Sequence, residues 1–263
     1  MTAYLRLFRT GVRASFADYL VDLSPTIYLG VHVPRTILQA LFFVLIAKAA
    51  GGDPLARFAA IGNAVQMAVF FAVLSMEVVI ESEKWNNTFL YMIAAPLHWL
   101  PIMVGKSVFQ FLDAFFSAAI VFAVLIPLMN LQISILNLLA SVPLILLTIL
   151  SVGTLGWLIG SICLPIRWGF VICNLMAYAM MVLCGVNFPI SALPPILRTV
   201  GAILPFTHGL LAIRAIIDGA TYASVWPLIR NEILIAIIYG SLAWITFGYR
   251  LWVTRQKGAF ELV

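Results

Sequence analysis

The sequence predicts an all-helical membrane protein that crosses the bilayer six times. The first reason is composition, since 63% of the 263 residues are hydrophobic and only 10% are charged, whereas soluble domains are about 45–50% apolar and about 25% charged. The second reason is a mean hydropathy of +1.09. The third is a series of separate apolar runs with no stretch polar enough to form a soluble domain. Nearly the whole chain is therefore expected in or at the membrane.

Six apolar runs are long enough to cross a bilayer, for which a helix needs about 20 mostly apolar residues. Helix-breaking residues separate them, as in Gly51-Gly52-Asp53-Pro54, at Pro127 followed by Asn130, and at Pro165. The predicted spans are 29–50, 58–80, 100–128, 133–162, 168–186 and 233–253.

A seventh apolar region, 190–217, is interrupted by prolines and by Arg198, His208 and Arg214. Such a segment is expected to form broken helices that dip into the membrane while buried in protein. Six spans place both termini on one side. The larger number of Lys and Arg residues in the loops of that side predicts that it is cytoplasmic.

The segment before the first span, 1–25, is predicted to be an amphipathic helix lying in the membrane interface. Arg6, Arg9 and Arg13 flank one side of its apolar stripe. Two interpretations stay open: a simple membrane anchor, or a lever that touches a cytoplasmic partner. The stripe, whose members recur every three or four residues, consists of Leu5, Phe8, Val12, Phe16, Tyr19 and Leu23.

No catalytic, nucleotide or metal site is expected in this chain. Gly105-Lys106-Ser107 ends like a phosphate-binding loop, but Leu100 stands where that loop requires glycine. If ATP is used, another polypeptide must bind it. The histidines are scattered, and three cysteines, an odd number within apolar runs, indicate buried free thiols.

One ionisable residue, Asp113, lies well inside the third span. Charged groups within membranes are unfavourable and are therefore candidates for function. The alternative is a structural hydrogen bond to a neighbouring helix.

The loop 81–96 is predicted to contain a short amphipathic helix ended by Pro96, with aromatic residues that suit a docking surface. It resembles the coupling loop of ABC-2-type transporter permeases, which has an acidic residue, Gly-Thr, two leucine-like residues and a final proline. Two positions depart from that pattern, Asn87 in place of glycine and Leu90 in place of glutamate. The matching positions are Glu83, Thr88, Met92, Ile93 and Pro96.

The region 187–219, between the last two spans, resembles the extracellular re-entrant region of the same family. That region has Gly, Phe-Pro, Leu-Pro, a short helix, Leu-Pro-x-Thr and then an arginine. The matching residues are Gly185, Phe188-Pro189, Leu193-Pro194, Leu204-Pro205, Thr207 and Arg214.

The resemblance implies a single transmembrane domain over 1–263 that dimerises, with a second copy or a paralogue, on separate ABC ATPase subunits. Those subunits would bind ATP and Mg, so this chain needs no cofactor and no metal. Helix 1–25 and loop 81–96 would contact the ATPase. Site residues implied in this way are Glu81, Glu83, Trp85, Asn87, Thr88, Phe89 and Pro96 for coupling; Arg6, Arg9, Arg13 and Phe16 in the interfacial helix; and Phe188, Pro189, Leu193, Pro194 and Pro205 at the outer gate.

The expected function is the permease of an ATP-driven exporter in a bacterial cell membrane, moving a hydrophobic or amphipathic small molecule or lipid. Polysaccharide export stays open, and nucleic acid is not an expected partner. One alternative is a secondary transporter or channel, which would need a polar mid-membrane site such as Asp113. A membrane-embedded enzyme is the other, and it is disfavoured because no catalytic constellation is present.

Overall fold

The computed structural model describes residues 2–22, 25–85, 99–165 and 168–257. Within these ranges every regular element is a helix, which confirms the predicted class. By length and composition, four helices could cross a membrane, or five if one bent pair counts as a span. The four are Tyr28–Glu83, Leu100–Leu128, Ile135–Cys163 and Tyr222–Gln256.

The longest helix, α3 (Val33–Trp85), is a helical hairpin of two arms. Its backbone is non-helical at Gly51 and Gly52, and Gly52 has a φ of +69°, a conformation that glycine adopts readily. The break lies where the sequence predicts one. It divides α3 into a first arm, 33–50, and a second arm, 53–85.

Two short elements lead into the first arm, α2 (Pro25–Ile27) and the π-helix η1 (Tyr28–His32). After the second arm come α5 (Leu100–Leu128), with the bounds predicted for the third span, and α6 (Ile135–Cys163). The next helix, α7 (Gly169–Leu183), has only 15 residues and is shorter than the predicted span 168–186.

The proline-interrupted region is broken as predicted. It forms the 3₁₀ turn η2 (Ile190–Ala192), then α8 (Pro195–Ile203) and α9 (Thr207–Ile217), and the last two meet at an angle of 88°. The final helix, α10 (Tyr222–Lys257), begins well before the predicted span 233–253.

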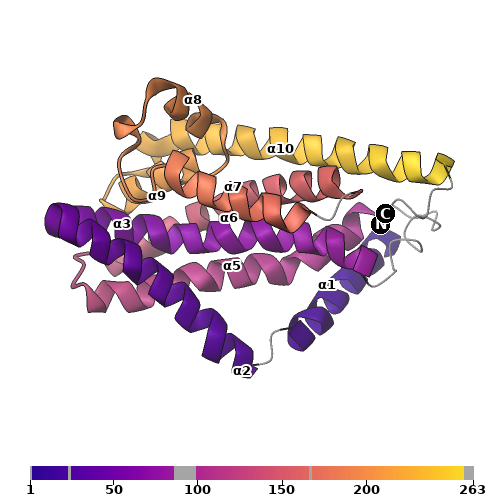
Figure 1. The fold of residues 1–263 in the computed structure, drawn as a ribbon, viewed down its shortest axis with the longest axis horizontal. Helices are drawn as coiled ribbons and strands as arrows, with labels where there is room; N and C mark the ends of the chain where they lie inside the picture. Colours follow the sequence, from indigo (N-terminus) through magenta and orange to yellow (C-terminus); the bar gives the residue numbers. More distant parts are fainter. Residues whose placement is uncertain (1, 23–24, 86–98, 166–167, 258–263) are drawn as a thin grey trace.

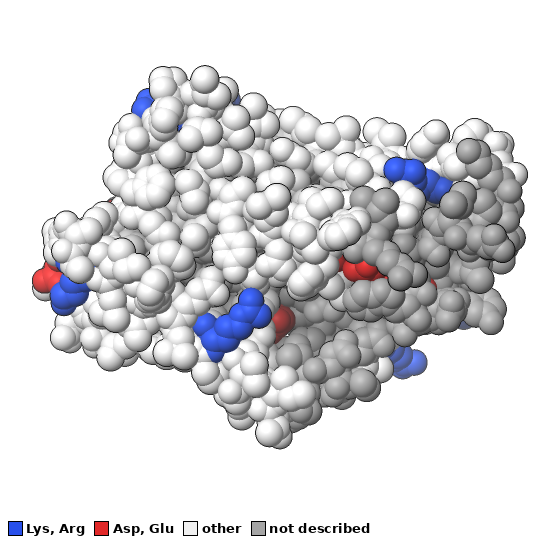
Figure 2. Space-filling model, in the orientation of Figure 1, with Lys and Arg blue, Asp and Glu red and all other residues white. Residues whose placement is uncertain are grey.

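Figure 1 shows the second arm, α5, α6, α7 and α10 running along the long axis of the molecule. The start of α1 (Thr2–Asp22) and the end of α10 lie at one end, here called the terminal end. The turn of α3, α8 and α9 lie at the other, the hairpin end. In Figure 2 most of the visible face is uncharged, with charged atoms toward the two ends and a group of basic atoms near the middle that has acidic atoms beside it.

The second arm is the centre of the core. Its side chains from Ala59 to Val73 are almost all buried, and the consecutive residues Ala64, Val65 and Gln66, which point about 100° apart around a helix, are each 1% exposed or less. A helix that is apolar on every side must be surrounded by other helices. The second arm therefore presents little surface of its own, and its neighbours supply most of the surface of the described bundle.

Candidate coupling and gating sites

At the terminal end, α1 packs against α5 through two glycines. A Cβ atom added at Gly11 would lie 3.2 Å from Cα of Gly105, and closer still to the carbonyl oxygen of Ile102. Small residues let two helix backbones approach this closely. The packed face is therefore centred on Gly11 and Ser15, not on the predicted apolar stripe, in which Leu5 and Phe16 are about half exposed.

Next to this contact, α3 and α5 are joined by an ion pair between Glu83 and Lys106. The side chains are only 6% and 13% exposed, respectively. The hydroxyl of Ser107 donates to the carbonyl oxygen of Met103 at 2.9 Å. The segment that resembles a phosphate loop is thus helical and already bonded within the protein. Gly11, Glu83, Gly105 and Lys106 together are called the terminal junction.

Of the residues implied in ATPase coupling, Glu83 lies in the terminal junction and Glu81 is half-buried one turn before the end of α3. Trp85 is the last residue of α3. Arg6, Arg9 and Arg13 are exposed, and the ring of Phe16 lies 5.1 Å from that of Phe109 on α5. Four further predicted positions lie outside the described residues: Asn87, Thr88, Phe89 and Pro96.

At the hairpin end, Arg214 of α9 binds three backbone carbonyls. Its guanidinium donates to Gly185 and Val186, each at 2.8 Å, and to Phe58 at 3.1 Å. It also lies 3.5 Å from the centre of the Phe58 ring. Gly62 leaves room for it, because a Cβ there would lie 2.5 Å from Nη2. Arg214 therefore holds α9 to the end of α7 and to the second arm.

Glu232 of α10 holds the other end of α9. Its two carboxylate oxygens accept hydrogen bonds from the backbone N–H groups of Phe206, at 2.9 Å, and Gly209, at 3.0 Å. A negative charge at a helix start satisfies otherwise unpaired donors and complements the helix dipole. Glu232 is fully buried. Glu232 was not among the predicted site residues, and its one signal in the sequence is an acidic residue just before a predicted span. Arg214 and Glu232 are called the hairpin-end lock.

The predicted outer-gate residues lie in the loops around α8 and α9. Pro189 precedes η2, Pro194 precedes α8, and Pro205 lies in the turn between α8 and α9. Leu193 and Pro205 are buried, Phe188 is half-buried, and Pro189 and Pro194 are exposed. The amide of Asn63 on the second arm donates to the side-chain oxygen of nearby Asn187 at 2.7 Å, which ties this region to the core.

Level with the middle of α5, Asp113 lies beside His32 of η1. Asp113 is the fourteenth of the 29 residues of α5 and is 8% exposed. Its Oδ1 lies 3.8 Å from His32 Nε2, which also lies 3.2 Å from the hydroxyl oxygen of Ser117. A polar cluster therefore joins the entry of the first arm to α5. π-Helical turns such as η1 are frequent at functional positions.

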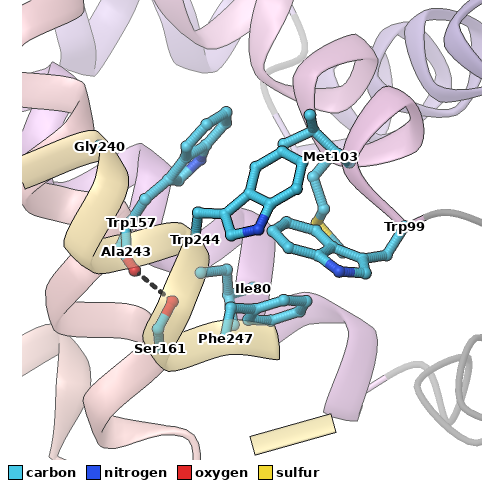
Figure 3. Close-up of a pocket in the computed structure, with 10 residues that line it drawn as sticks. Ile80, Trp99, Met103, Trp157, Ser161, Gly240, Ala243, Trp244 and Phe247 are labelled. Atoms are coloured by element: carbon cyan, nitrogen blue, oxygen red, sulfur yellow. Dashed lines mark hydrogen bonds between the residues drawn. The ribbon is translucent and has the colours of Figure 1, made fainter. Parts of the chain in front are cut away.

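An apolar pocket opens at the terminal end, with an empty volume of about 470 Å³. Figure 3 shows the rings of Trp99, Trp157, Trp244 and Phe247 around it, contributed by the start of α5, α6 and α10. The ring centres of Trp99 and Phe247 are 4.5 Å apart. The lining suits an aromatic or aliphatic group, and Ile80, Leu100, Met103, Ser161, Gly240 and Ala243 complete it.

The three cysteines are buried free thiols, as predicted. Among the described residues there is no group of three His, Cys, Asp or Glu side chains that could hold a metal ion.

Long apolar helices around a buried central arm, with the few polar side chains binding backbone or one another, are the architecture of a multi-pass membrane protein. Residues 15–217 match the family model of the ABC-2 type transporter. The chain belongs to that family, as its two motif regions indicated, and it is a transporter permease. Permeases of this family work with ABC ATPase subunits. A comparison with curated proteins gave no match.

Proposed function

We propose that the chain is the permease subunit of an ATP-driven exporter for a hydrophobic or amphipathic compound, such as a drug, a natural product or a lipid-like molecule. The two arms of α3, α5, α6, α7 and α10 provide six passes, with both termini cytoplasmic and α8–α9 re-entrant from the outside. The protein acts as a dimer, with a second copy or a paralogue, in a bacterial cell membrane. ATP and Mg bind to the separate ATPase subunits.

The observation that carries this proposal is the terminal junction. Helix α1 and the base of loop 81–96 are the two elements expected to contact the ATPase, and both are fastened to the same two turns of α5, through Gly105 and Lys106. An ATPase that displaces either element therefore displaces α5 as well. Two discrete arrangements of such a packed helix bundle are sufficient for alternating access.

The apolar pocket supports the expected class of cargo. Ligand sites for apolar compounds are concave and lined mainly by aromatic and aliphatic side chains. Three tryptophans and a phenylalanine line this pocket, and Ser161 is the one hydroxyl residue among the lining residues. A surface of this kind favours apolar groups over inorganic ions or free sugars.

The test is co-reconstitution of the permease and its ATPase in liposomes, with ATP-dependent uptake of a fluorescent amphipathic dye into inside-out vesicles as the measurement. Gly11→Ala forces α1 away from α5, and overpacking of this kind costs about 1–3 kcal/mol. We expect uptake per ATP hydrolysed to fall about tenfold, the equivalent of about 1.4 kcal/mol. Gly248→Ala is the matched control, because a Cβ at Gly248 on α10 meets no atom within 4 Å.

Two results would contradict the proposal. Dye uptake driven by a proton gradient without any ATPase would assign the chain to the secondary transporters. A reporter fused after Val263 that is found outside the cell, or one inserted at Asp53 that is found inside, would reverse the orientation on which the coupling argument depends.

A further inference from the structure

Arg35 is an exposed cation near the middle of the helix bundle. It lies one turn beyond His32, which contacts Asp113 at the midpoint of α5. Its guanidinium carbon lies 5.3 Å from the centre of the Phe70 ring, near the midpoint of the second arm. The side chain therefore lies over an aromatic face, at a distance typical of a cation–π contact, and does not extend to either end of the bundle.

Beyond the polar cluster of His32, Asp113 and Ser117, one turn before Arg35, the exposed side chains that follow it are apolar. On the first arm, the exposed Leu38 and Phe42 follow it at positions three and seven, on the same helix face. The ring of Tyr178 on α7 lies 5.8 Å from Phe70 and is 45% exposed. On α7 the exposed Leu175 continues that face. We call this the Arg35 face: Arg35, Leu38 and Phe42 of the first arm, and Leu175 and Tyr178 of α7, with Phe70 between them.

This face is unsuited to contact with lipid chains. An arginine at the centre of a membrane helix costs about 2.5–3.5 kcal/mol even on the most permissive scale. Charged residues at this depth normally face a water-filled cavity or a partner that supplies the opposite charge. None of the ion pairs among the residues that the structure describes includes Arg35, so its exposed guanidinium is open to an opposite charge from outside the chain.

A second copy of the chain does not supply that charge from the side chains described. Each described carboxylate is buried, half-buried or already paired with a cation of its own chain. The buried or half-buried ones are Glu77, Glu81, Asp113 and Glu232, and the paired ones are Asp53, Glu83 and Asp218.

We propose that Arg35 binds an anionic group of the cargo, a carboxylate or a phosphate, while the apolar side chains of the Arg35 face hold the cargo's apolar body. This inference rests on the proposed export function and narrows its cargo from amphipathic compounds in general to amphipathic anions. A guanidinium binds both anions through two parallel N–H···O bonds.

The experiment measures equilibrium binding to the full-length permease in phosphatidylcholine nanodiscs, without the ATPase. The probes are dansyl-labelled undecanoic acid and its methyl ester, which share an apolar body and differ in charge. We expect the wild type to bind the acid about tenfold more tightly than the ester, as for one charge-assisted contact. Arg35→Gln should abolish the preference, and Arg35→Lys should keep part of it. Arg230→Gln, which removes an exposed arginine of α10, is the control and should change nothing.

Equal binding of the two probes by the wild type, or a preference that survives Arg35→Gln, would overturn the inference. So would a preference that disappears when phosphatidylglycerol replaces part of the phosphatidylcholine, because a lipid headgroup would then be the ligand. A weaker dimer in Arg35→Gln with unchanged probe preference would assign the counter-charge to a second copy, which also overturns it.

The inference about Arg35 and the proposed export function can be refuted independently of each other. A preference for the acid without any ATP-driven uptake in liposomes would count against the proposed function and leave the inference standing. ATP-driven uptake that does not distinguish the acid from the ester would count against the inference and leave the proposed function standing.

Discussion

The two ends of the molecule use charged side chains in different ways. At the hairpin end, Arg214 and Glu232 bind backbone groups, three carbonyls and two N–H groups respectively. At the terminal end, Glu83 and Lys106 bind each other, and the backbones of α1 and α5 meet at glycines. One end is fastened through the main chain and the other through side chains and close packing.

The difference bears on which end can move. A hydrogen bond to a helix terminus can be broken only by leaving a buried backbone group unsatisfied, at a cost of about 1–3 kcal/mol for each group. Two helices that meet at glycines and are joined by flexible side chains can change their angle while they stay in contact. We therefore expect the hairpin-end lock to keep its geometry in the transport cycle, and the terminal junction to tilt while Gly11 stays against Gly105 and Glu83 stays paired with Lys106.

The largest expected effect is at the hairpin-end lock. Glu232→Ala leaves the N–H groups of Phe206 and Gly209 without their acceptor, which should lower the free energy of unfolding by about 4 kcal/mol. Arg230→Ala, two residues away with an exposed side chain, should change it by less than about 0.5 kcal/mol. Chemical unfolding in detergent micelles measures both. A loss below about 1 kcal/mol for Glu232→Ala would show that α9 is held by packing alone.

An intermediate effect is expected at the terminal junction. Lys106→Met leaves the buried Glu83 carboxylate without this cation. Breaking a fully buried ion pair costs about 3–5 kcal/mol of stability. Because Lys106 is partly exposed, we expect the free energy of unfolding to fall by about 2–3 kcal/mol. The charge-swapped double variant, Glu83→Lys with Lys106→Glu, should recover more than half of the lost stability and of the uptake per ATP. If the stability losses of the two single variants simply add in the double variant, Glu83 and Lys106 do not interact, and the pair does not join α3 to α5.

The smallest effect is expected for an exposed ion pair of the hairpin end. Arg57 and Asp218 lie 2.7 Å apart but are 36% and 52% exposed, and such pairs contribute about 0–1 kcal/mol. Asp218→Asn should therefore lower the unfolding free energy by less than about 1 kcal/mol, with the difference reduced further in high salt. If Asp218→Asn lowered the free energy of unfolding as much as Glu232→Ala, the contribution of a charged residue at the hairpin end would not depend on its burial.

What could be predicted from the sequence was mainly local. The glycine pair 51–52, the bounds 100–128 and the proline-broken region were predictable because each is marked by residues that act on their own backbone. Glu232 was not, since its partners are 23 and 26 residues away in the chain. The pairing of Gly11 with Gly105 was equally hidden, because a glycine within a helix signals close packing only when its partner helix is known.

The burial of the second arm also bears on how the protein is made. Gln66 of that arm donates at 3.0 Å to the carbonyl oxygen of Ala177 on α7, which is synthesised 111 residues later. Until α7 enters the bilayer, this amide lacks that partner and unfavourable contact with lipid is its alternative. The second arm, the most enclosed in the finished protein, is therefore inserted early, whereas the hydrogen bond of its Gln66 amide forms only after α7 has been inserted. Slowing the synthesis of α6 and α7 should prolong that interval and make the half-finished chain a target for membrane quality control.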